Sequence, residues 1–451
     1  MKPFATKLQL LAAMLISISV WITTGCTSSE TDLLESVPAS AQTVMTVNLN
    51  KLAHDAGYTD KNGNIALPDY MFESIPLSPE QIVALGAVVD LEHIVAYSLG
   101  GSNFTLTFNI KDEDALKAIA TASGATSSQT QGYTVYSFRG SQIAVKDGQG
   151  WCDPNAVATA ELSREKRDAD GSYTMYKGLA EYLNIDRPIS VIICAEAPKN
   201  AAQRGKFLCA ALSGNQEGAS INSCIMHASG EKISMDMLTT LHTDFLRYTP
   251  ANMNIVFAAG LTDKIDWNDF SETVTSMGGT RARGFFDSIF DILKQADGTV
   301  ALCADGYTLL GNDPGVLFMA HLPQSTLNTT LTELVNQASS MGMNVTRRED
   351  GQYKATLMGT NLYAGSVDGY LSIGSQPFVP TRENSLTTTF EGQRAAAYIS
   401  LETLAPYVSG CNFGIALTAK TGDTDTDIHV NFPGSNEQPL ATLIKLCHML
   451  L

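Results

Sequence analysis

Three aspartates near the end of the chain have the type and spacing that could hold a metal ion. Asp423, Asp425 and Asp427 alternate in the run Asp-Thr-Asp-Thr-Asp. Carboxylate oxygens in this spacing can bind calcium in a loop, but such a loop needs glycine at its sixth position and glutamate at its twelfth. This chain has Ile428 and Gly434 there. We therefore expect a solvated acidic hairpin tip, with a calcium site as the alternative.

Three short motifs contain residues that could carry nucleophilic catalysis. They are Ser163-x-x-Lys166, Ser213-Gly214-Asn215 and Lys420-Thr421-Gly422. In this order they resemble the motif set of penicillin-binding proteins and serine β-lactamases. The resemblance implies that Lys166 helps to deprotonate Ser163 and that the third motif holds a substrate carboxylate. The context departs from that family, because Ser163 begins a highly charged stretch and the gap before Lys420 is long.

No other motif with an associated chemistry occurs in the chain. The seven histidines lack H-E-x-x-H spacing, and G-x-S-x-G, Walker A and G-x-G-x-x-G are absent from the sequence. Tyr173, Tyr176 and Tyr182 could form a carbohydrate platform, but about one and a half helical turns separate the last two, so they do not share a face. We expect these tyrosines in a core or an exposed helix, and no catalytic residue, metal ion or cofactor.

The composition is that of a large, acidic, globular chain. Of its 451 residues, 44% are hydrophobic and 17% are charged, and 46 acidic residues outnumber 29 basic ones. The apolar fraction excludes a disordered chain. The lack of a run rich in lysine and arginine argues against nucleic acid as a partner. At about 100–200 residues per domain, the length predicts two to four domains.

Residues 1–25 have the layout of a bacterial lipoprotein signal peptide. Two lysines precede the apolar run Leu8–Ile22, which is shorter than the roughly 20 residues of a membrane-spanning helix. The run leads into Thr-Thr-Gly-Cys, which resembles a lipobox with Thr23 where leucine is common. The resemblance implies cleavage before Cys26, diacylglycerol on its thiol and an acyl chain on its new amine.

Acylated Cys26 would anchor the mature chain in lipid through the polar tether 26–35. Thr27 stands where an aspartate would oppose sorting to the outer membrane, so we expect the outer membrane, with either the periplasmic or the cell-surface face. The formal net charge is −17, and removal of two lysines with the leader makes it −19. This charge favours neutral, cationic or protein partners over anionic ones.

The cysteines in the apolar runs are expected to be buried thiols. The sequence leaves the pairing of the cysteines open. The eight cysteines include no C-x-x-C motif, and with Cys26 acylated an odd number remains. Cys194, Cys209 and Cys303 lie in apolar runs that read as strands, where inert buried thiols are expected. Cys194 with Cys209 or Cys224 could bridge neighbouring strands, and the sequence does not decide between these pairings.

The body of the chain repeats itself. Pro38-Ala39 and Pro250-Ala251 each lead into an apolar strand, and superposing them at an offset of about 212 aligns Val44 with Val256. A strand, a helix ended by glycine and a hairpin follow in both halves. The recurring helices are expected over Asp112–Ser123 and Leu327–Met341, and the recurring turns at Asp147-Gly148 and Asp368-Gly369.

The repeat predicts a tandem duplication with an α+β fold. Each half should be a mixed or antiparallel sheet with helices packed on it. Two polar stretches, Ser163–Gly171 and Pro377–Asn384, are interpreted as linkers or exposed loops. The predicted parts are the signal peptide 1–25, the tether 26–35, the first half 36–247 and the second half 248–451.

The mature chain resembles a family of lipid-anchored envelope proteins of unknown function from gut-type Bacteroidota. The resemblance rests on Val37–Ala41 leading to Val47–Leu52 just after the lipobox, and on the repeated strand–helix–hairpin order. The family brings no known catalytic residues. We therefore expect a non-catalytic binding or structural protein, held by outer-membrane lipid through Cys26, whose partner is an unknown protein or glycan. A serine-type envelope hydrolase and a calcium-stabilised adhesin are the alternatives.

Overall fold

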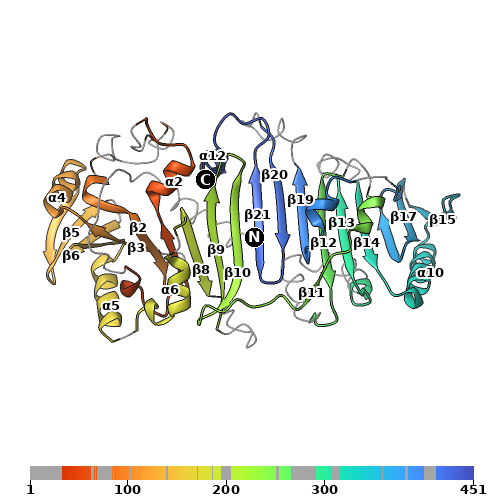
Figure 1. Ribbon diagram of the computed structural model, residues 1–451, viewed down its shortest axis with the longest axis horizontal. Helices are drawn as coiled ribbons and strands as arrows, with labels where there is room; N and C mark the ends of the chain where they lie inside the picture. The colour runs from red at the N-terminus through yellow and green to blue at the C-terminus, as the bar shows by residue number, and fades with distance from the viewer. Residues whose placement is uncertain are drawn as a thin grey trace. The chain divides into compact units, whose positions relative to one another are not determined.

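The computed structural model describes most of the chain after the predicted leader (Figure 1). The signal peptide and Cys26 lie outside the described residues. Leu33 and Leu34, which the sequence placed in the tether, belong to the short 3-10 helix η1 (Leu33–Ser36) and are buried. The described residues are 33–61, 66, 68, 84, 86–100, 104–138, 141–169, 171–184, 186–194, 205–249, 253–265, 291–305, 315–357, 359–380, 384–400 and 413–450.

The chain divides into two compact units. Unit 2 comprises Ser234–Ser435, and unit 1 comprises the chain up to Ile233 together with Asn436–Leu451. The sequence analysis placed the second half at 248–451. The chain instead enters unit 2 at Ser234 and returns to unit 1 for its last segment.

Unit 1 is built on an antiparallel sheet. Its strands lie in the order β4-β5-β6-β7-β3-β2-β1-β8-β9-β10. The bounds are β1 Thr43–Val47, β2 Val89–Ser98, β3 Thr105–Ile110, β4 Thr126–Thr130, β5 Tyr133–Phe138, β6 Ser141–Lys146, β7 Gln149–Asp153, β8 Ile189–Cys194, β9 Lys206–Gly214 and β10 Ala219–His227.

Unit 2 repeats this order with a second antiparallel set, β15-β16-β17-β18-β14-β13-β12-β19-β20-β21. The short strand β11 also pairs with β12. The bounds are β11 Leu238–Thr239, β12 Ile255–Leu261, β13 Thr299–Ala304, β14 Val316–His321, β15 Asn344–Arg347, β16 Tyr353–Leu357, β17 Thr360–Val367, β18 Tyr370–Gly374, β19 Ala395–Ser400, β20 Ala416–Thr421 and β21 Asp425–Asn431.

This architecture corrects the predicted fold class of two α+β halves with helices packed on each sheet. Of the residues that the structure describes, 41% are in strands and 26% in helices, and the strands form antiparallel sheet. The described residues form 21 strands, and every ladder within the two units is antiparallel. The prediction was wrong because hairpins build most of each unit, while the helices cover the sheets only locally.

The two predicted Asp-Gly turns are confirmed. Asp147 and Gly148 have φ values of 55° and 73°, and Asp368 and Gly369 have 45° and 85°. Positive φ at both central residues defines a type I′ turn, whose twist matches that of the joined strands. Each turn therefore fixes the register of an equivalent hairpin, β6–β7 in unit 1 and β17–β18 in unit 2.

Helices cover both faces of the unit 1 sheet. Alternate residues of β1 separate the faces, because Met45 packs with α2, α4 and α12, whereas Val44 packs with η1, η3 and α6. Helix α5 covers β6 and β7 (Figure 1). The bounds are α2 Leu49–Asp55, α4 Glu113–Ala122, α5 Ala156–Asp168, η3 Tyr173–Met175, α6 Lys177–Leu183 and α12 Pro439–Leu450.

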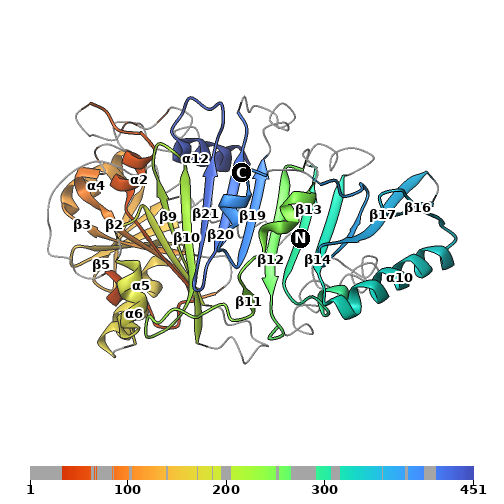
Figure 2. The same ribbon diagram turned by 45° about the vertical axis from the view of Figure 1, so that its right-hand side comes forward.

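The described residues of unit 2 cover its sheet with other elements. Helix α10 (Gln324–Ser340) lies beside β17 (Figure 2). Its Leu327 packs against one face of the sheet. The other face is covered by η5 (Thr243–Tyr248), α11 (Thr387–Phe390) and the extended chain at Phe378. No helix among the described residues of either unit is long and apolar enough to cross a membrane.

Candidate functional site

The serine of the predicted catalytic motif lies in helix α5 and is fully buried. Ala156, Ala160 and Ser163 recur at helical spacing, and all three face the sheet with 0% exposure. The Ser163 hydroxyl lies 2.7 Å from the Tyr97 hydroxyl and donates to the carbonyl of Thr159 at 2.9 Å. Ser163 therefore fixes α5 to the sheet and is closed to a substrate.

A buried polar cluster surrounds this serine. Thr105 donates its hydroxyl to Asp153 at 2.7 Å, and Asp153 accepts the backbone N–H of Asn155 at 2.5 Å, just before α5 begins. Burial and the nearby carboxylate of Asp153 raise the pKa of Tyr97 to about 12, so its hydroxyl stays protonated. Each of these contacts orients the start of α5 or its buried face.

The other two motifs of the predicted serine set do not join Ser163. Ser213 lies on β9 of unit 1, directly opposite Ser220 of β10. Lys420 lies on β20 of unit 2, opposite Asp427, and the neighbouring Thr421 hydroxyl is 3.0 Å from that of Thr426. With Ser163 buried, the described residues do not arrange these motifs for acyl transfer.

The three candidate calcium ligands lie at the β20–β21 hairpin, as the sequence predicted. The Asp423 side chain forms an ion pair with Arg394, and Asp425 accepts the hydroxyl of Thr424 at 2.7 Å. Asp427 stands opposite Lys420. The described residues contain no group of three His, Cys, Asp or Glu side chains placed to hold a metal ion. The aspartates are thus engaged with protein partners.

The tyrosines considered for a carbohydrate platform pack inward. Tyr173 is 1% exposed and Tyr182 is 9% exposed. The rings of Tyr173 and Tyr176 meet edge to face at 5.7 Å, and Tyr176 also packs against Phe207 of β9. These side chains belong to the core under α6.

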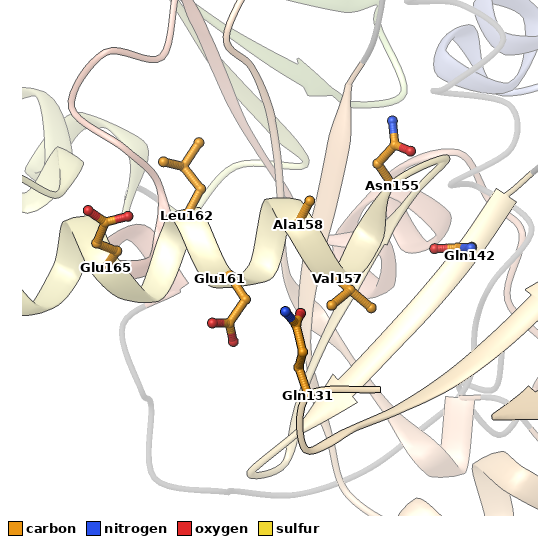
Figure 3. A pocket seen from close by; sticks show the side chains of 8 residues that line it. All are labelled: Gln131, Gln142, Asn155, Val157, Ala158, Glu161, Leu162 and Glu165. Atoms are coloured by element: carbon orange, nitrogen blue, oxygen red, sulfur yellow. The ribbon is translucent and has the colours of Figure 1, made fainter. Parts of the chain in front are cut away.

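A hollow of about 570 Å³ opens along the outer side of α5. Figure 3 shows Glu161 pointing from the helix toward the space that Gln131 enters from the β4–β5 turn. The lining residues are Gln131, Gln142, Asn155, Val157, Ala158, Glu161, Leu162 and Glu165.

The lining of the α5 hollow combines carboxylates, amides and a small apolar strip. Glu161 and Glu165 are one helical turn apart on α5 and therefore share a face. Lys146 lies 3.9 Å from Glu161, so it offsets part of the negative charge. Amides and carboxylates can hydrogen-bond hydroxyl groups, and the carboxylates can attract a cation. The lining itself contains no serine, cysteine, histidine or lysine nucleophile.

This site was not predicted from the sequence, because Ser163–Gly171 was interpreted as a linker or an exposed loop. Of the charged residues in this stretch, Glu165 is exposed on α5, and the half-buried Arg164 forms an ion pair with Asp147 at 2.9 Å. The buried side offers only Ala156, Ala160 and Ser163, which carry little hydrophobicity. The spacing of four and three residues between these positions was the signal in the sequence for a helix with one buried face.

Comparison with known proteins leaves the function to be argued from geometry. No protein-family model, curated protein or solved structure significantly matches this chain.

Proposed function

We propose that this protein is a lipid-anchored, non-catalytic binding protein of the bacterial outer membrane, held there by acylated Cys26. Its α5 hollow contacts a hydroxyl-rich glycan of neutral or positive charge. The membership in the Bacteroidota envelope family is part of the same proposal. It rests on the lipobox-like run before Cys26 and on Val37–Ala41 with the strand that follows.

The observation that carries the proposed binding role is the chemistry of the α5 hollow. Two carboxylates and three amides line one open space. Such groups bind hydroxyls through several hydrogen bonds, and those to a charged carboxylate are the stronger ones. The formal charge of −17 disfavours an anionic glycan.

The glycan proposal is tested on an array of neutral, amine-bearing and acidic glycans with the full mature chain. We expect neutral or amine-bearing glycans to bind and acidic ones to fail. Replacing Glu161→Gln and Glu165→Gln together should weaken binding about tenfold or more, because charged hydrogen bonds are lost. The matched control is Glu181→Gln on α6, an exposed glutamate 3.8 Å from Lys177. Equal binding by both variants would contradict the proposal.

The anchor is tested separately by fractionation of cells that express the full chain. The wild type should stay with the outer membrane and enter detergent, whereas Cys26→Ala should lose the acyl chains and leave the membrane. Protease added to intact cells then reports the face, since only a surface protein is digested before the membrane is opened. Membrane retention of Cys26→Ala would refute the lipid anchor.

A further inference from the structure

Two cysteines of unit 1 stand directly opposite each other in the sheet. Cys209 on β9 pairs with Cys224 on β10. Directly opposite residues of antiparallel strands have Cα atoms about 4.5–5.5 Å apart. A disulfide accepts Cα separations of about 4.4–6.8 Å, so this pair meets the geometric requirement.

Both side chains point into the same core. Cys209 is 0% exposed and Cys224 is 2% exposed, and both pack with Val44, Tyr97 and Ile192. The Cys209 thiol hydrogen-bonds with Cys224, and this contact together with burial raises its pKa. The two sulfurs are therefore neighbours on one face, although the structure holds them as thiols.

The register also excludes the other pairings that the sequence left open. Cys194 on β8 stands opposite Phe207, two residues from Cys209. Such diagonal neighbours are about 7–8 Å apart, beyond the reach of a disulfide. Cys194 and Cys224 lie on strands that flank β9, so two interstrand spacings of about 4.8 Å separate them. Of these three thiols, only Cys209 and Cys224 fit each other.

We propose that Cys209 and Cys224 form a cross-strand disulfide when the chain folds in an oxidising compartment. This inference rests on the proposed export of the chain. Each thiol loses one hydrogen, and one S–S bond forms between the two sulfurs. The two electrons and two protons pass to an oxidoreductase that carries its own disulfide. The S–S bond of that oxidant is reduced to two thiols by two exchange steps. Because both sulfurs are buried in the folded unit, the bond closes before the β9–β10 hairpin packs.

The sequence around the pair gives a direct assay. Both cysteines lie in one tryptic peptide, residues 207–232, and Glu217 stands between them. The exported full chain is denatured without reductant, alkylated and digested. If the disulfide is present, the mass of this peptide should be two hydrogens below that of its dithiol form, and the peptide should carry no alkyl group. Cleavage after Glu217 should leave its two parts joined until reductant is added.

Two controls separate this inference from the proposed anchor. The chain expressed without residues 1–25 stays in the reducing cytoplasm and should take two alkyl groups on this peptide. A chain that reaches the envelope but is still alkylated twice without reduction would overturn the disulfide and leave the anchor standing.

A stability measurement gives a second readout. The bond closes a loop of about 15 residues, so reductant should lower the Tm of the exported protein by about 5 °C or more. Cys303→Ser should keep this response, because Cys303 is a buried strand thiol opposite Val256 and Leu317. Cys224→Ser should abolish it, and an unchanged response in Cys224→Ser would contradict the assignment.

Discussion

The two units cover the same face of equivalent strand pairs in different ways. In unit 1, Ala144 and Trp151 stand opposite each other on β6 and β7, and α5 packs over them. The corresponding residues of unit 2 are Gly365 and Ser372 on β17 and β18. Extended chain at Phe378 lies there instead, and a Cβ on Gly365 would come within 2.9 Å of its ring.

Each cover depends on a matching sheet surface. A helix over Trp151 requires small residues, which Ala156 and Ala160 supply. The extended chain is held by one amide side chain, because Gln352 donates to the carbonyl of Phe378 at 3.0 Å and accepts its N–H at 3.1 Å. The strand order is thus shared, while the helical cover of this face, and with it the α5 hollow, is found in unit 1 among the residues that the structure describes. We infer that binding differences between the units reside in the covers.

The largest effect on stability is expected when the packing between α5 and the unit 1 sheet is disrupted. Trp151→Ala should lower the free energy of unfolding by about 3–5 kcal/mol, because a fully buried side chain leaves a cavity under α5. Its indole N–H has no hydrogen-bond partner among the described residues, so the loss reports packing. Ser372→Ala, at the equivalent position, should cost less than about 1 kcal/mol. Denaturant unfolding followed by circular dichroism checks both, and similar costs would show that the covers are not distinct.

A smaller effect is expected when the cover of unit 2 is released. Gln352→Ala should cost about 2–3 kcal/mol, because the buried N–H and carbonyl of Phe378 lose their partner. Hydrogen exchange at the Phe378 amide should become faster. Gln129→Ala is the matched control, since this exposed amide of unit 1 bonds only the Thr134 hydroxyl among the described residues, at 2.9 Å. It should change stability by about 0.5 kcal/mol or less. Unchanged exchange in Gln352→Ala would mean that other contacts hold the segment.

The smallest effect concerns acid stability. Burial of Asp90 in unit 1 opposes ionisation, but hydrogen bonds from His93 and the Glu92 N–H, with the charges of His93 and Lys111, outweigh it and lower its pKa. A lowered folded-state pKa contributes stability above the unfolded value of about 3.9, which is lost as pH falls through the folded pKa. Asp90→Asn should therefore cost less than about 1 kcal/mol at pH 7 and nothing at low pH.

Asp350 of unit 2 provides the contrast for this pH experiment. Its pKa is also lowered, because hydrogen bonds from the Gln352 N–H and Arg348 outweigh burial. Its side chain is 39% exposed, against 14% for Asp90. Titration of the free energy of unfolding should show a smaller acid-dependent loss for Asp350→Asn than for Asp90→Asn. The reverse order would indicate that local burial does not set the size of the effect.

The sequence predicted the repeated elements well where periodicity was strong. The helices at α4 and α10 and the two Asp-Gly turns are confirmed.

Other features could not be predicted from local patterns. Leu238–Leu241 and Leu440–Leu443 have similar sequences, but the former contains β11 and the latter lies in helix α12. Four residues are too few to define a period. The polar cluster at Asp153 was also missed, because its partners Thr105 and Tyr97 come from strands that meet only in the sheet.

The return of the chain to unit 1 has a consequence for the order in which the two units are completed during synthesis. Helix α12 supplies Leu440 to the core of unit 1, and Tyr58 bonds the carbonyl of Ala441. A chain that emerges N-terminus first delivers all of unit 2 before this helix. The unit that is synthesised first is therefore the last to be completed, and until then part of the apolar face of its sheet is exposed to chaperones and proteases.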